Sequence, residues 1–156
     1  MTIALYAGSF DPITYGHLDI IQSASEVFDK VIVAVAYNEQ KQCFIPVSDR
    51  LALITECVKD FPNVEVDSYE GLTVDYASLN NVSVLIRGIR NAMDYEYEKE
   101  LALVNSKLNN KIKTVLLFAK PEHSCVSSSN AREIFNNNGD LSDFVPQNVI
   151  NYLNNK

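Results

Sequence analysis

The stretch that decides the fold covers residues 2–17 and reads Thr2-Ile3-Ala4-Leu5-Tyr6-Ala7-Gly8-Ser9-Phe10-Asp11-Pro12-Ile13-Thr14-Tyr15-Gly16-His17. Residues 2–7 have the length and apolar character of a buried strand, and Gly8 permits a tight turn after it. Gly16-His17 then opens an amphipathic helix whose apolar residues recur at helical spacing as far as Phe28. A strand, a glycine turn and a helix N-terminus together present backbone N–H groups at the positive end of a helix dipole. Such an arrangement suits phosphate.

Three side chains add chemistry to this loop: the imidazole of His17 and the hydroxyls of Ser9 and Thr14. Each has a structural alternative, since a histidine can cap its own helix and hydroxyls are common in turns. The position of His17 directly after Gly16, at the mouth of a phosphate loop, favours a functional imidazole.

The rest of the chain alternates between strand-like and helix-like segments. Further strands are expected at 31–36, 64–69, 82–86 and 114–118, and helices at 48–59, 72–79, from 94, 127–138 and 146–153. Ser48 and Asp94 are the expected N-caps of two of these helices. The alternation predicts βαβ units and a single doubly wound, Rossmann-like α/β domain over residues 1–156. Its five-stranded, mainly parallel sheet would carry helices on both faces.

The expected ligand crevice lies between the first and fourth strands, if the strand order is 3-2-1-4-5. The fourth strand is followed there by Arg87-Gly88-Ile89-Arg90, read as a glycine turn with two arginines that can grip phosphate bidentately. Ser127-Ser128-Ser129 opens a later helix, either as ordinary N-caps or as a second anion site. Glu98 is by default a surface acid or one that compensates the helix dipole, and Lys41 is by default a solvated loop lysine.

Composition narrows the class of protein. The net charge of −7 argues against non-specific nucleic-acid binding, so an anionic ligand needs local cations. Those available are Lys41, Arg87, Arg90, Lys120 and Arg132. No apolar run is long enough to span a membrane, and no export signal is evident, which predicts a cytoplasmic protein. An odd number of cysteines without metal-like spacing predicts buried free thiols at Cys43, Cys57 and Cys125.

The inventory lacks a Ser/His/Asp nucleophile set, a Cys-x-x-Cys pair, a closely spaced metal cage and a G-x-x-x-x-G-K-[ST] loop. What it offers is positioning and positive charge. Phosphoryl or nucleotidyl transfer needs little more, provided that the attacking group is itself an oxyanion.

Thr14-Tyr15-Gly16-His17 resembles the [TH]-x-G-H signature of the nucleotidyltransferase superfamily. Three further stretches resemble the bacterial phosphopantetheine adenylyltransferase family in particular, and the resemblance runs in register through essentially the whole chain. They are Gly8-Ser9-Phe10-Asp11-Pro12, Leu85-Ile86-Arg87-Gly88-Ile89-Arg90 continuing to Asp94-Tyr95-Glu96-Tyr97-Glu98, and Val126-Ser127-Ser128-Ser129. Two places depart from the family: His123 replaces a bulky aromatic residue, and Phe44-Ile45-Pro46 forms a variable loop.

The resemblance implies a reaction, adenylyl transfer from ATP to 4′-phosphopantetheine, which gives dephospho-coenzyme A and pyrophosphate with Mg²⁺ held mainly by phosphates and water. It implies that His17 is catalytic and stabilises the α-phosphate. It assigns ATP to Ser9, Phe10, His17, Gly88, Ile89, Arg90, Glu98, His123, Ser124, Cys125, Val126, Ser127, Ser128 and Ser129. It assigns phosphopantetheine to Ser9, Lys41, Thr73 and Arg87. It also implies a homohexamer, a dimer of trimers, with coenzyme A as a possible feedback ligand.

Three alternatives stay open at this point. The same chemistry could act on another acceptor, such as nicotinate mononucleotide or glycerol phosphate, although the segment from Arg87 to Glu98 argues against it. The chain could be a non-catalytic nucleotide-binding module, or a flavodoxin-like redox protein.

Overall fold

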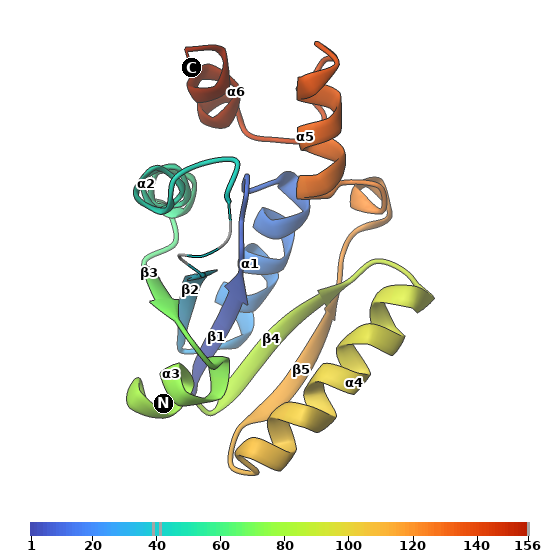
Figure 1. The fold of residues 1–156 in the computed structure, drawn as a ribbon. Coiled ribbons are helices and arrows are strands. Elements are labelled where there is room, and N and C mark those ends of the chain that lie inside the picture. The colour runs from blue at the N-terminus through green and yellow to red at the C-terminus, as the bar shows by residue number, and fades with distance from the viewer. Residues whose placement is uncertain (39, 41, 156) are drawn as a thin grey trace.

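A computed structural model describes residues 1–38, 40 and 42–155 as helices around one five-stranded sheet (Figure 1). The strand order is β3-β2-β1-β4-β5, and every neighbouring pair is parallel. β1 lies at the centre, and its Leu5 pairs with Ile32 on one side and with Leu85 on the other. The expected α/β class, the five strands and their order are confirmed.

The strands are β1 (Ile3–Gly8), β2 (Lys30–Tyr37), β3 (Val64–Glu70), β4 (Val84–Ile89) and β5 (Lys113–Phe118). The α-helices are α1 (Tyr15–Val27), α2 (Val47–Val58), α3 (Thr73–Leu79), α4 (Ala92–Leu108), α5 (Ser128–Asn136) and α6 (Gln147–Asn154). A 3₁₀ turn, η1, spans Pro121–His123. Figure 1 shows α5 and α6 beyond the end of the sheet toward which the strands point.

Alternation along the central strand divides the core between the two faces of the sheet. Ala4 and Tyr6 point into one apolar cluster, which α1, α2 and α6 complete. Leu5 and Ala7 point into a second cluster, which α3 completes. Because both faces of β1 are covered, its sequence is apolar throughout, as expected for a central parallel strand.

Three predictions about element ends are wrong. The fourth strand runs to Ile89, so Gly88 lies within β4 and forms no turn. Pro46, and not Ser48, is the N-cap of α2, and its carbonyl accepts the first helical N–H bonds. Asn91, and not Asp94, caps α4 by accepting the Asp94 N–H at 2.9 Å.

The three cysteines are free, but the prediction that they are buried is wrong. Cys43 and Cys125 are exposed, and Cys57 is half-buried beside Asn148. Burial is the largest influence on the Cys57 thiol and raises its pKa. Across the described ranges, each helix is too short or too polar to cross a membrane.

Candidate active site

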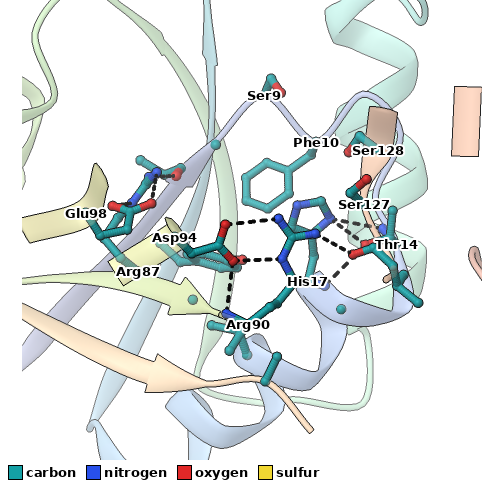
Figure 2. Close-up of a pocket in the computed structure, with 18 residues that line it drawn as sticks. Ser9, Phe10, Thr14, His17, Arg87, Arg90, Asp94, Glu98, Ser127 and Ser128 are labelled. Carbon is teal, nitrogen blue, oxygen red and sulfur yellow. Dashed lines mark hydrogen bonds and ion pairs between the residues drawn. The ribbon is translucent and has the colours of Figure 1, made fainter. Parts of the chain in front are cut away.

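A cavity of about 270 Å³ lies at the carboxyl ends of β1 and β4, at the expected crevice (Figure 2). The N-termini of α1 and α5 both reach it, so two positive dipole ends converge on one space. The lining residues are Tyr6, Ala7, Gly8, Ser9, Phe10, Thr14, Gly16, His17, Ile20, Arg87, Gly88, Arg90, Asp94, Glu98, Ala119, Val126, Ser127 and Ser128.

His17 is held by the residue that caps its helix. Thr14 is the N-cap of α1, and its side chain accepts the His17 N–H at 3.4 Å. In return the Thr14 N–H donates to Nδ1 of His17 at 3.1 Å, which completes a capping box. A ring nitrogen that accepts a hydrogen bond carries no proton, so the proton of the neutral ring is on Nε2. The helix cap therefore determines the tautomer and leaves Nε2–H as a donor.

The His17 ring is neutral over the ordinary pH range. Burial is the main cause, followed by the positive charges of Arg90 and Arg87, and together they lower its pKa from 6.5 to about 4. The ring packs edge-on against Phe10, with centroids 5.0 Å apart, and lies 6.3 Å from Tyr6. A neutral, orientated imidazole is a hydrogen-bond donor here, and a poor acid.

Arg87 and Arg90 are bound in the same manner. Arg87 donates through Nε and Nη2 to Glu98, at 2.7 and 2.9 Å, and through Nη1 to the Ala7 carbonyl at 2.8 Å. Arg90 donates through Nε and Nη2 to Asp94, at 3.0 and 3.4 Å, and through Nη1 to the Val126 carbonyl at 3.1 Å. A guanidinium has five N–H donors. Within the described part of the chain each arginine therefore keeps two donors for a ligand.

Glu98 is consequently a buried partner of Arg87, and the expectation of a surface acid is wrong. The pair is tight because the carboxylate and the guanidinium meet in a bidentate geometry. Burial opposes the charge of Arg87, but the hydrogen bonds and charge of Glu98 prevail, and the pKa of Arg87 is raised.

Two glycines allow close packing around the cavity. A Cβ on Gly88 would lie 2.8 Å from Cγ1 of Ile20, so α1 can approach β4 only over a glycine. A Cβ on Gly16 would lie 3.2 Å from the Val126 carbonyl, where α1 meets the start of α5. Both contacts hold the helix of His17 against the rest of the site.

Most of the residues that the sequence singled out line this cavity. They are Ser9, Phe10, Thr14, His17, Arg87, Gly88, Arg90, Glu98, Val126, Ser127 and Ser128. Ser127 caps α5 by accepting the Asn130 N–H, and Ser128 donates to the Pro12 carbonyl at 2.8 Å.

The other predicted residues lie outside the lining. Ile89 is buried in β4, and Thr73 makes a 2.7 Å hydrogen bond with the hydroxyl of Tyr69. The ring of His123 is stacked on that of Tyr15, with ring centroids 6.4 Å apart. Ser124, Cys125 and Ser129 are exposed. Lys41 lies outside the described residues.

The two remaining cations serve other contacts. Lys120 pairs with the buried carboxylate of Asp19 at 3.2 Å, and Arg132 donates to the Asp11 carbonyl at 2.7 Å. Sequence reasoning missed Asp94 as the partner of Arg90. The signal was present, because the two residues are four apart, although Arg90 lies just before the helix. Tyr6 was missed as well, since within an apolar strand it looks like any core residue.

No group of three or more His, Cys, Asp or Glu side chains in the described ranges is arranged to hold a metal ion.

A second cavity, of about 500 Å³, adjoins the first and shares Ser9 with it. Its other described walls come from the β1–α1 loop, the end of β2, β3, the start of α2 and the loop between β2 and α2, and they are mixed in polarity. The lining residues are Ser9, Asp11, Ala36, Tyr37, Asn38, Gln42, Cys43, Val47, Arg50 and Ser68.

Residues 5–134 match the cytidylyltransferase-like family model. In overall fold the chain resembles a protein of Vibrio parahaemolyticus described as a nicotinate-nucleotide adenylyltransferase. The TM-score is 0.73 with 20% identity, over 99% of this chain and 93% of that one. A lipopolysaccharide core biosynthesis protein of Thermoplasma volcanium aligns with a TM-score of 0.54 and 22% identity, over 77% of this chain and 97% of the other. At these identities the likeness concerns the fold alone.

Sequence relatives are much nearer. The chain is 47% identical to the phosphopantetheine adenylyltransferase of Caldanaerobacter subterraneus subsp. tengcongensis over 153 residues, 98% of this chain and 96% of the relative. It is 48% identical to the enzyme of that name from Crocosphaera subtropica over 151 residues, 97% and 96% of the two chains. The Leuconostoc citreum protein of the same name is 48% identical over 154 residues, 98% and 97%. Within the nucleotidyltransferase superfamily, the chain belongs to the phosphopantetheine adenylyltransferase family.

Proposed function

We propose that this chain, as one nucleotidyltransferase domain over residues 1–156, transfers the adenylyl group of ATP to 4′-phosphopantetheine. The products are dephospho-coenzyme A and pyrophosphate. Family membership over nearly the full length supports the reaction. The observation in the site that carries the proposal is His17, whose Nε2–H is left free by the Thr14 cap where two helix N-termini converge.

The proposed role of His17 is to donate from Nε2 to the α-phosphate as negative charge accumulates in the transition state. A donor that is already orientated needs no reorganisation at the moment of reaction, and this is the main source of such stabilisation. The imidazole is uncharged at neutral pH, because its pKa is about 4.

No general base is needed in this scheme. The acceptor phosphate has a second pKa near 6, so it is largely dianionic at neutral pH and can attack the α-phosphorus itself. The new P–O bond forms in line as the bond to pyrophosphate breaks, and no covalent enzyme intermediate arises. The protein contributes position and charge, which phosphoryl-transfer chemistry mainly requires.

We assign ATP to the cavity between α1, β4 and α5. The contacts proposed within it are Ser9, Phe10, His17, Gly88, Arg90, Glu98, Val126, Ser127 and Ser128, with Ile89, His123, Ser124, Cys125 and Ser129 at its margin. The acceptor is assigned to Ser9, Lys41, Thr73 and Arg87. Ser9 suits a position between the substrates, because it lines both cavities.

Magnesium is the proposed metal, and ATP phosphates with water would be its main ligands. Asp94 and Glu98 are the carboxylates that line the first cavity, and each already binds an arginine. A metal coordinated by phosphates fits this donor set better than one coordinated by the protein. When bound, the ion would neutralise charge on the two polyanionic substrates.

A homohexamer in the cytoplasm is the proposed assembly and location, with coenzyme A as a feedback ligand. Support for assembly comes from α4 and the edge strand β5, which expose apolar side chains. They are Met93, Tyr97, Leu103, Val104, Leu108 and Phe118. Exposed apolar surface of this extent is typical of an interface between subunits.

The test is pyrophosphate release from ATP and Mg²⁺ with a panel of acceptors. Phosphopantetheine should support turnover, whereas nicotinate mononucleotide and glycerol phosphate should not. Turnover with one of the latter would replace the acceptor assignment. ATP binding without pyrophosphate release for any acceptor would reduce the chain to a nucleotide-binding module.

A further inference from the structure

The loop between β1 and α1 is held from outside by its carbonyl groups. Just before the loop, Arg87 binds the carbonyl of Ala7 in β1. Within the loop, Arg50 binds the carbonyl of Ser9 at 2.6 Å and Arg132 binds that of Asp11. Ser128 binds the next carbonyl, that of Pro12. The four donors come from β4, α2 and α5, so three separate elements fix the end of β1 and the short loop that follows it.

Arg50 is the member of this set that binds the carbonyl of Ser9, the residue that lines both cavities. It lies in the first turns of α2, is only 3% exposed, and faces the second cavity. Its Nε is buried, with no hydrogen-bond acceptor among the described residues. The hydrogen bond that α2 sends to the loop is therefore the Nη1 contact with Ser9.

The contact determines which way the next peptide points. In a trans peptide the C=O and the following N–H point in opposite directions. Because Arg50 holds the Ser9 carbonyl on the side of the second cavity, the Phe10 N–H is turned to the other side. Phe10 lines the first cavity and packs on His17.

Phe10 also has an unusual backbone conformation. Its φ is +45°, in a region that non-glycine residues rarely occupy and bulky ones avoid. Such a conformation persists only where the surroundings impose it. The buried Phe10 ring and the Arg50 contact on the preceding carbonyl are two such constraints.

We propose that Arg50 is a positioning residue for adenylyl transfer: it holds the Ser9 carbonyl and so aims the Phe10 N–H at the transferring phosphate. Its proposed effect is exerted through the loop, by way of the Ser9 carbonyl. The inference rests on the proposed function and names a residue that the motifs of the site do not include.

The experiment compares the full-length protein with Arg50→Lys and Arg50→Ala, in pyrophosphate release with ATP and phosphopantetheine. Arg50→Ala should lower kcat by about 10²-fold, with a smaller change in the KM for ATP, because misaimed groups act mainly in the transition state. Arg50→Lys retains a cationic donor and should retain more of kcat. Because Arg50 lines a cavity, millimolar methylguanidinium should restore part of the kcat of Arg50→Ala.

Asn148→Ala is the matched control. Asn148 on α6 donates to the Leu53 carbonyl of α2 at 3.1 Å, so its loss also removes a side-chain donor from a carbonyl, but away from the loop. It should lower thermal stability and leave kcat unchanged. If Arg50→Ala does not fold, Arg50→Lys carries the test against the same control.

Three results would overturn the inference: Arg50 variants with the kcat of the wild type, an Asn148→Ala variant that loses kcat as Arg50→Lys does, or a loss in Arg50→Ala that methylguanidinium leaves unchanged. Each presupposes an active wild type. A wild type that releases no pyrophosphate would instead refute the proposed function, so the two failures are distinguishable.

Discussion

Removing His17 should separate catalysis from binding. His17→Ala deletes one donor that is already orientated, and losses of this kind lower kcat by about 10²-fold or more. ATP affinity should change less, because the donor acts mainly on charge that develops in the transition state. The variant should stay folded, since Thr14 still accepts the backbone N–H of residue 17 and can cap the helix.

The same substitution should change how stability depends on pH. In the folded protein His17 has a pKa of about 4, against 6.5 in the unfolded chain. Between these values the unfolded state binds more protons than the folded state does. The contribution of His17 to the free energy of unfolding is therefore fully present above pH 6.5 and is lost as the pH falls toward 4. At about 1.4 kcal/mol for each pKa unit, a difference of about 2.5 units limits the loss from His17 to about 3.5 kcal/mol.

Two measurements check these expectations. Urea unfolding at pH 7 and pH 4.5 should show that the wild type loses about 2 kcal/mol more than His17→Ala does. Pyrophosphate release should show the loss of kcat, while His123→Ala, from the outer loop, changes KM modestly and keeps kcat within about tenfold. Nitrogen NMR of the wild-type imidazole at pH 7 should report the proton on Nε2.

The reasoning fails if His17→Ala turns over nearly normally while His123→Ala is inactive. It also fails if the two proteins lose equal stability on acidification, since the pKa of His17 would then be the same in both states. A proton on Nδ1 would contradict the capping-box argument directly.

Four other outcomes follow from the same contacts. Gly88→Ala should lower both Tm and kcat, with about 1–3 kcal/mol of destabilisation, because its Cβ would overlap Ile20; an unchanged Tm would contradict that packing. Arg87→Ala should weaken the binding of phosphopantetheine more than that of ATP, as measured by calorimetry. Equal losses of affinity would contradict the assignment of Arg87 to the acceptor. Light scattering should give a mass well above 17.5 kDa at micromolar concentration; a monomer would refute the hexamer. Thiol titration of denatured, unreduced protein should count three free thiols, those of Cys43, Cys57 and Cys125, and a count of one would indicate a disulfide. In a second titration, of the native protein, two of the three thiols should react quickly.

The order of the sheet was predictable because the signal is redundant. Short apolar runs alternate with amphipathic helices, and each run such as that of Ile3–Gly8 has the pattern of a strand covered on both faces. Element ends were less predictable, because several residues near an end can cap a helix. At α4 both Asn91 and Asp94 could have done so. The carboxylate of Asp94 is drawn to Arg90 instead, and Asn91 is left to cap.

The local part of the site was also predictable, and the long-range part was not. Thr14 and His17 are three residues apart on one helix turn, so their relation follows from the sequence alone. Arg87 and Glu98 meet only because α4 packs across β4, and no spacing rule joins a strand to a later helix. The burial of Arg50 under the loop is of the same kind.

These long-range contacts change how the site must recognise phosphate. The sequence suggested a cluster of free cations in an acidic protein, yet the arginines of the first cavity are each matched by a carboxylate, and His17 is neutral. The side chains that line this cavity therefore carry no net charge. For the two polyanionic substrates of the proposed reaction, the attraction is expected to come from the helix N-termini of α1 and α5, from the remaining guanidinium N–H groups and from the proposed magnesium ion. Such groups favour charge only where they point. The orientation of the hydrogen-bond donors consequently matters more in this site than the number of cations. Thr14 sets this orientation for the imidazole, and the arginines that bind loop carbonyls set it for the loop.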